Sequence, residues 1–359
     1  MKRAVAAGVL AAAIAAVLAF TLRGSSAAAE VFVTSRLVSD GGVAAPVHDR
    51  ALVNGWGLVA SSTGPWWTTN EASDKSTLYT GDGRKQLLTV SVPGGPTGIA
   101  FNPGHGFRIS GGGASDPARF VYACEDGRIR AWTPTVPAGW STTAVVAVDS
   151  AARGAIYRGV AFAGGRLYAT DFHNDRIDVF DANWRPVKLA KGAFEDSRIT
   201  PWYAPDNVQA FGNRLFVAYV YRAPVDGNDA PTGGYVDEFD LQGHLVGRVA
   251  HMGVLQEPWG LAIAPASFGR YGGDLLVANF GNGHINAFRQ TTKGWRFDGA
   301  LENRDGRPLS VNGVWGIAFG NGASAGPSDS LFFMSGPHRW IGATELGVHG
   351  LFGSISLAP

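Results

Sequence analysis

The sequence lacks most of the chemistry that cross-links or strongly charges a protein. Its 359 residues include a single cysteine, Cys124, so no disulfide can form within the chain. Charged residues make up only 16% of the chain and contain no basic run of the kind that binds nucleic acid or an anionic membrane surface. We therefore expect a fold held together by its apolar core, with no nucleic-acid partner.

Helical periodicity is also missing. Outside the first thirty residues, no apolar run has the 3.6-residue spacing of an amphipathic helix. Short runs of Val, Ile, Phe and Tyr are separated instead by Gly, Pro, Asn and Asp, which is typical of an all-β chain. The 50 glycines have no three-residue period, which excludes a collagen-like chain.

The N-terminal segment, residues 1–29, has the pattern of a secretory signal peptide. Two basic residues precede an uncharged apolar stretch (4–20), and residues 27–29 form an Ala-Ala-Ala cleavage site. A membrane anchor is the alternative, because residues 4–22 carry no charge, but the many alanines make this stretch only weakly apolar. We expect a secreted or periplasmic protein, whose mature chain has a net charge of −2 and no membrane span.

A phrase of five residues recurs six times along the chain. The copies read WGLVA, TGIAF, RGVAF, NVQAF, WGLAI and WGIAF, and they align on Gly57, Gly98, Gly159, Asn207, Gly260 and Gly316. Successive copies are 41 to 61 residues apart, which is the scale of a propeller blade. The repeat predicts one structural unit per copy.

Further strand-like sequence follows each copy. Second strands are predicted at residues 66–70, 120–125, 166–171, 214–219, 274–279 and 330–335. In the middle units a third strand alternates, and a turn leads to a fourth, such as PVKLA (186–190) or LVGRVA (245–250). Four strands repeated six times predict a six-bladed β-propeller over residues 30–359. We expect strand 30–38 to complete the last blade beside strand 351–357, leaving no open edge.

The residues of the phrase have separate roles. Its glycine lets the inner strands of neighbouring blades approach closely. Asn207 replaces glycine in the fourth copy, which suggests that this position needs a positive φ angle. Trp56, Trp259 and Trp315 precede the glycine, and we expect them to fill the wedges between blades. An aromatic floor for a ligand is the alternative.

Motifs along nearly the whole chain resemble known propellers. The broad resemblance is to six-bladed propellers of the NHL and gluconolactonase type. A closer one covers residues 36–356 and rests on stretches such as LVSDGGVAAPVHDRALVNGWGL, YATDFHNDRIDVFDANWRPV, ANFGNGHINAF and GLFGSI. It is to a family of exported bacterial propellers, many of which carry a PEP-CTERM sorting tail. This chain shows no such tail before Pro359, and it departs from the family pattern at Gly55 and Asp206.

Familiar catalytic motifs are missing. The sequence has no G-x-S-x-G elbow, no H-E-x-x-H, no P-loop and no complete G-x-G-x-x-G. Its eight histidines are scattered without a pair at ligand spacing, so a zinc or copper site is not supported.

One polar pattern remains. In a propeller, the starts of the inner strands and the ends of the second strands lie on the same face, and here both carry polar residues. Asn54, Glu125, Asp171 and Asn207 would offer oxygen ligands there to Ca²⁺ or Mg²⁺. The gluconolactonase-type resemblance implies such a site, with the metal as Lewis acid. His173 and Asp171 are then the candidate catalytic residues.

The same face offers candidate ligand-binding side chains, namely Arg158, Asp206, Tyr219 and Asn279. Arg158 could clamp a ligand carboxylate or form an ion pair with a neighbouring acid. Polar residues in turns often satisfy only local backbone groups, so a structural role is also open. Two functions therefore stay open. One is a monomeric binding module for a small molecule, glycan or surface protein, and the other is a divalent-metal hydrolase of lactones or related esters.

Overall fold

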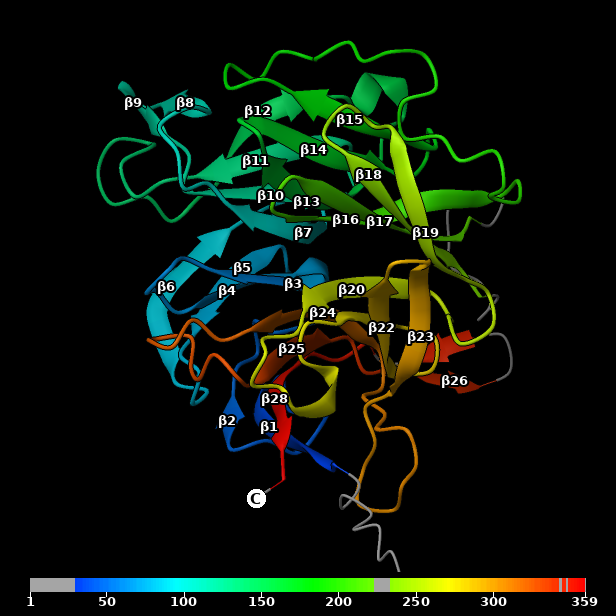
Figure 1. Ribbon diagram of the computed structural model, residues 1–359. Helices are drawn as coiled ribbons and strands as arrows, with labels where there is room; N and C mark the ends of the chain where they lie inside the picture. The colour runs from blue at the N-terminus through cyan, green and yellow to red at the C-terminus, as the bar shows by residue number, and fades with distance from the viewer. Residues whose placement is uncertain (1–29, 223–232, 342–343, 347, 359) are drawn as a thin grey trace, which may run out of the picture.

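The computed structural model describes residues 30–222, 233–341, 344–346 and 348–358. Six β-sheets surround a central channel as blades, and no α-helix occurs among the described residues (Figure 1). The predicted all-β, six-bladed propeller is confirmed. No helix in these ranges is long and apolar enough to cross a membrane. The predicted signal segment, residues 1–29, lies outside the described residues.

In each blade the strands run from the innermost outward. Blade 1 contains β3 (Gly55–Ala60), β4 (Trp66–Asn70), β5 (Lys75–Tyr79) and β6 (Lys85–Ser91). Blade 2 contains β7 (Pro96–Phe101), β10 (Phe120–Cys124), β11 (Arg128–Trp132) and β12 (Val145–Asp149), with a hairpin of β8 (Arg108–Gly111) and β9 (Ala114–Pro117) inserted after β7. Blade 3 contains β13 (Tyr157–Ala163), β14 (Arg166–Asp171) and β15 (Arg176–Phe180).

The second half of the ring follows the same plan. Blade 4 contains β16 (Tyr203–Phe211), β17 (Arg214–Tyr221), β18 (Tyr235–Asp240) and β19 (Leu245–His251). Blade 5 contains β20 (Pro258–Ile263), β21 (Leu275–Asn279), β22 (Ile285–Thr291) and β23 (Gly294–Ala300). Blade 6 contains β24 (Val314–Phe319), β25 (Leu331–Ser335), β28 (Leu351–Leu357), β1 (Phe32–Ser39) and β2 (Val47–His48). A hairpin of β26 (Arg339–Ile341) and β27 (Thr344–Leu346) precedes β28. Three short 3-10 turns, η1 (Glu71–Ser73), η2 (Ala151–Arg153) and η3 (Gly269–Tyr271), connect strands.

Blade 6 draws its strands from both ends of the described chain. β1 pairs antiparallel with β28, from Phe32 opposite Leu357 to Ser39 opposite Leu351, with one irregularity in register. The innermost strand of this blade, β24, contacts β3 of blade 1, so the inner strands form a closed ring. β1 therefore takes the place of a fourth strand in blade 6 (Figure 1).

Blade 3 has three strands rather than the predicted four. Residues 186–190 form no strand, although Val187 N donates one hydrogen bond to Val179 O at 2.7 Å. The chain then crosses to blade 4, where Phe194 N donates to Gly243 O at 2.8 Å. The prediction of a fourth strand here was wrong because the chain leaves the edge of β15 after one turn.

The inner strands approach so closely that the glycines of the repeated phrase leave no space for a side chain. A Cβ at Gly260 would lie 2.3 Å from the carbonyl oxygen of Trp315 in the next blade. The predicted close approach is thus confirmed. The predicted positive φ is not, because neither these glycines nor Asn207 adopts one. Asn207 is instead used for its side chain, whose Nδ2 donates to Trp259 O at 2.7 Å.

The apolar core lies between the blades. Six clusters of buried side chains each join two neighbouring blades, one cluster for each of the six interfaces. Between blades 1 and 2, for example, Trp67 stacks on Phe120 with ring centres 3.9 Å apart. Cys124 is buried in the same cluster as a free thiol. Every blade therefore depends on both neighbours for its burial.

Gly260→Ala tests the close approach at the axis. The added Cβ would meet a backbone oxygen that cannot move without shifting the next blade. We therefore expect the free energy of unfolding to fall by about 1–3 kcal/mol or more. Gly247→Ala in β19 is the control, because a Cβ there meets nothing within 4 Å. Urea unfolding followed by tryptophan fluorescence measures both. Equal stability of the two variants would contradict the interpretation.

Candidate functional site

The central channel has two ends of different chemistry. We call the end where the inner strands begin the tryptophan end, after Trp56, Trp259 and Trp315. We call the end where these strands finish the cavity end, because a cavity opens there beside Ala60 and Phe211. All candidate residues from the sequence analysis belong to the strand starts and exits of the tryptophan end.

Arg158, at the tryptophan end, is held between two acidic side chains. Its Nη1 donates to Asp206 Oδ1 at 2.9 Å, and its Nε lies 3.3 Å from Glu125 Oε1. Its guanidinium carbon lies 3.9 Å from the ring centre of Phe172 and 5.7 Å from that of Trp56. Burial alone would lower the pKa of Arg158, but the two carboxylates outweigh burial and hold it above the ordinary value. Arg158 therefore cross-links blades 2, 3 and 4 as a buried cation.

A second acidic side chain, Glu71, lies beside Glu125. One carboxylate oxygen of each lies 3.5 Å from the position that a Cβ on Gly95 would occupy. Asn54 Nδ2 donates to Glu71 Oε2 at 2.8 Å. Burial is the main cause that raises the pKa of Glu71; repulsion from Glu125 adds to it, and the bond from Asn54 offsets part. Glu71, which follows β4 directly, was not among the predicted site residues.

The three tryptophans pack against one another. Trp56, Trp259 and Trp315 are 5%, 2% and 4% exposed. Trp56 stacks on Trp315 with ring centres 3.7 Å apart, and Trp259 meets both edge-on at 5.9 and 6.0 Å. Phe280 stacks on Trp315 at 4.0 Å. They form one buried cluster contributed by blades 1, 5 and 6, which confirms the expected packing role and argues against the alternative of an aromatic floor for a ligand.

The four predicted metal ligands have partners within the protein. Asp171 Oδ2 accepts a hydrogen bond from Asn174 Nδ2 at 2.8 Å, and Asn207 is bonded to the next blade as described above. The other two form the ion pair with Arg158 and the hydrogen bond to Glu71. Among the described residues, no three or more His, Cys, Asp and Glu side chains are grouped so that they could hold a metal ion. The Ca²⁺ or Mg²⁺ site stays a prediction.

The remaining predicted residues also bond to nearby parts of the protein. Tyr219 donates its hydroxyl to Phe194 O at 3.4 Å, and Asn279 Nδ2 donates to a backbone carbonyl at 2.8 Å. The backbone carbonyl of His173 accepts from Arg222 Nη1 at 2.7 Å. These bonds hold the turns of the tryptophan end in place, and they favour the structural interpretation of its polar residues.

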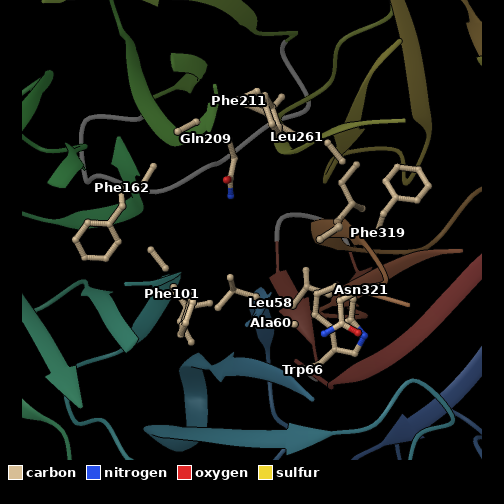
Figure 2. Close-up of a pocket in the computed structure, with 18 of the residues that line it drawn as sticks. Leu58, Ala60, Trp66, Phe101, Phe162, Gln209, Phe211, Leu261, Phe319 and Asn321 are labelled. Atoms are coloured by element: carbon tan, nitrogen blue, oxygen red, sulfur yellow. The ribbon is translucent and has the colours of Figure 1, made fainter. Parts of the chain in front are cut away.

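The cavity end opens into a space of about 440 Å³, within the range of small-molecule sites. All six inner strands contribute to its walls, and their side chains surround a common space (Figure 2). Phenylalanines from four blades are among them, at Phe101, Phe162, Phe211 and Phe319. None of the side chains that line the cavity is charged. Its walls are therefore suited to a neutral group.

Gln209 on β16 points into this cavity (Figure 2). The other five inner strands carry small apolar residues at the equivalent position, namely Val59, Ala100, Ala161, Ala262 and Ala318. No described residue forms a hydrogen bond with the Gln209 side-chain amide. Asn321 also lines the cavity, but its Nδ2 donates to the carbonyls of Ser61 and Gly64, each at 2.8 Å. Gln209 is thus the amide that a ligand in the cavity can engage.

Gln209 was not among the predicted site residues. Its signal was present in the fourth copy of the phrase, NVQAF, where glutamine stands in place of valine or alanine. The predicted site lay instead at the other end of the channel, because polar residues end the second strands there. Such residues commonly hydrogen-bond only to the backbone of their own turns.

Comparison with known proteins shows a family at the sequence level. No known protein-family profile matches the chain. Uncharacterized protein L690 of Acanthamoeba polyphaga mimivirus is 34% identical over 295 residues, which cover 79% of this chain and 77% of that protein. This chain belongs to the same family. Uncharacterized protein R648 of the same virus is 32% identical over 284 residues, which cover 75% of this chain and 69% of that one.

Solved structures share the fold. A protein of unknown function from Bacteroides thetaiotaomicron matches 91% of this chain with a TM-score of 0.56 and 11% identity, over 76% of its own length. The apo soluble aldose sugar dehydrogenase of Escherichia coli matches 91% of this chain with a TM-score of 0.54 and 11% identity, over its whole length. The expected likeness to six-bladed propellers is confirmed. Export and the PEP-CTERM association stay predictions.

Glu71→Gln tests the electrostatics of the tryptophan end. The pKa of Glu71 is raised in the folded protein, so its ionisation disfavours the fold. Wild-type stability should accordingly decline as the pH rises through the ordinary glutamate pKa and then the raised one. Glutamine still accepts from Asn54 but carries no charge, so the variant should lack this decline and exceed the wild type at neutral pH.

Urea unfolding between about pH 4 and about pH 8 measures this difference. Glu302→Gln, which removes the same charge from a loop after β23, is the control and should keep the wild-type slope. If Glu71→Gln also keeps that slope, the assignment to Glu71 is wrong.

Proposed function

We propose that this protein is a binding module whose ligand is a neutral, mostly apolar small molecule held in the cavity end of the channel. One observation carries the proposal. A cavity of about 440 Å³, bounded by all six inner strands and lined by uncharged, mostly apolar side chains, contains a side-chain amide, Gln209, that no described residue engages. Pockets with apolar walls and a few placed polar groups are typical ligand sites.

The chemistry of the walls supports a neutral ligand. Moving a charged group from water into an uncharged apolar cavity costs several kcal/mol unless a partner neutralises it, on the order of the penalty for a buried unpaired ion. The side chains that line this cavity supply no such partner. The part of the ligand that enters should therefore be uncharged, and the phenylalanines favour rings or branched aliphatic groups.

Gln209 supports a polar group on one side of the ligand. A glutamine amide offers both a donor and an acceptor, so it suits a carboxamide, lactam, ester carbonyl or hydroxyl. Left unpaired against an apolar ligand, such an amide would lose its water at a cost of about 1–3 kcal/mol. Gln209 should consequently select against purely hydrocarbon ligands of the same size.

Binding, rather than hydrolysis, is what this site supports. None of the cavity-lining side chains is an acid, a histidine, a cysteine or a lysine, so they offer no general acid, general base or thiolate. The metal-dependent hydrolase would require the four residues at the tryptophan end. Because the N-terminal segment has the pattern of a signal peptide, we propose that binding takes place outside the cytoplasm.

Two separate variants, Gln209→Leu and Ala318→Leu, test the cavity as the ligand site. A library of neutral fragments would be screened by thermal shift, and the hits measured by calorimetric titration. Ala318→Leu, which adds bulk to the wall, should abolish binding of every hit. Gln209→Leu should weaken hits that carry an amide, carbonyl or hydroxyl about tenfold or more, the loss expected for one buried polar contact.

Gln242→Leu in the turn after β18 is the matched control, because this glutamine is exposed. It should leave all affinities unchanged. Hits that bind both cavity variants as tightly as the wild type would place the ligand elsewhere and refute the proposal.

A further inference from the structure

Blade 3 ends on a strand whose outer edge is uncovered except at its C-terminal end, where Asp181 N donates to Arg185 O and Val187 N donates to Val179 O. In the five other blades a fourth strand pairs with the third, through β6, β12, β19, β23 and β1. In blade 3 the outermost strand is β15, which pairs on one side with β14. An uncovered edge of this kind presents backbone groups to which another chain can pair.

The direction of the backbone groups on β15 follows from one hydrogen bond. Val179 O accepts from Val187 N, so the groups of Val179 face away from β14. Residues two apart in a strand face the same edge, so the N–H and C=O of Ile177 face outward as well. No hydrogen bond from the described residues reaches these two groups. Ile177 thus offers one donor and one acceptor at the edge.

Two hollows of about 320 Å³ and about 560 Å³ flank this edge, between β15 and residues 186–201. Ile177, Phe194 and Glu195 line both of them. The smaller hollow lies beside Ile177 to Phe180 and the larger beside Asp175 to Ile177, so a peptide paired to β15 at Ile177 would place side chains in both. The edge and the hollows together have the form of a β-augmentation site.

The acidic residues of the larger hollow favour a basic side chain at one position of the peptide. Asp175 and Glu195 line it, and neither forms an ion pair with a described residue. The other charged residues there, Arg176 and Asp196, are already paired with neighbours on the protein. The charge of Arg222 acts on Asp175 without a direct ion pair, so a lysine or arginine entering this hollow would meet two carboxylates whose repulsion is only partly offset.

The rim of the groove carries an exposed tryptophan. Trp202 is 59% exposed and has a φ of 79°, in the left-handed region that disfavours a bulky side chain. Its two chain neighbours, Pro201 and Tyr203, line the larger hollow. Tryptophans of this kind are enriched among the residues that carry most of the energy at protein interfaces.

We propose that β15 is the docking edge for an extended peptide segment of a partner protein. The peptide pairs with β15 at Ile177, on the part of the edge that residues 185–187 leave uncovered, and places a lysine or arginine between Asp175 and Glu195. This interaction is separate from ligand binding in the channel, because the groove and the cavity share no lining residue.

The probe is a fluorescein-labelled eight-residue peptide of alternating threonine and valine with one central lysine. Fluorescence anisotropy against the full mature protein should show saturable binding. Replacing the lysine by glutamate should weaken binding at least tenfold. Methylation of the backbone nitrogens on alternate residues, which removes the donors on one peptide edge, should also weaken it at least tenfold. If neither change weakens binding, or if the probe does not bind at millimolar concentration, the proposal is overturned.

Variants of the protein give the matching test. Ile177→Pro removes the outward N–H, and proline is tolerated on an edge strand whose N–H faces solvent. It should abolish probe binding and keep the wild-type circular dichroism spectrum. Asp175→Asn with Glu195→Gln should weaken the lysine peptide at least fivefold and leave the glutamate peptide unchanged. Asp329→Asn, an exposed acid in blade 6, is the charge control and should change neither.

Should Ile177→Pro unfold, the methylated probe tests the same bond on the unaltered protein. Analytical ultracentrifugation decides between a partner and a second copy of this chain. A dimer of the wild type that Ile177→Pro dissociates would show that a second copy occupies the edge, and it would overturn the proposal.

Discussion

The passage of six inner strands around one axis is the constraint on which the rest of the structure depends. Where these strands come nearest, five carry glycine, and the sixth carries Asn207, whose amide bonds to the carbonyl of the next blade. This contact sets the width of the channel. In each inner strand, the side chains just before this contact lie at one end of the channel and those just after it at the other. Because space near the axis is limited, the size of these side chains decides whether each end of the channel is filled or open.

The two ends resolve that limit in opposite ways. Before the contact, three tryptophans and the buried Arg158 occupy the end of the channel, and removing Arg158 would leave the buried Asp206 without its counter-ion. After the contact, alanines and one valine leave a cavity into which Gln209 projects. The packed tryptophan end therefore supports the inner strands that carry the cavity at their other end.

The fold could be predicted from sequence because the repeat is local, whereas the site depends on exceptions to it. Six copies of one phrase specify blades and order, and the structure confirms them. Gln209 is a single departure at one position, and blade 3 loses its fourth strand although PVKLA has strand-like composition. The tryptophans could not be placed because a wedge between blades and a cluster at the axis require the same bulky apolar residue. The raised pKa of Glu71 depends first on burial and then on its contacts with Asn54 and Glu125, which no spacing in the sequence encodes.

The pairing of β1 with β28 has a consequence for the order of folding. These strands lie more than three hundred positions apart in the chain, so their ladder is among the last contacts that can form as the polypeptide emerges. The cavity needs β24 from the same blade as well as the five inner strands before it. The complete wall of the cavity therefore exists only after β24, the last of the six inner strands along the chain, has joined the ring.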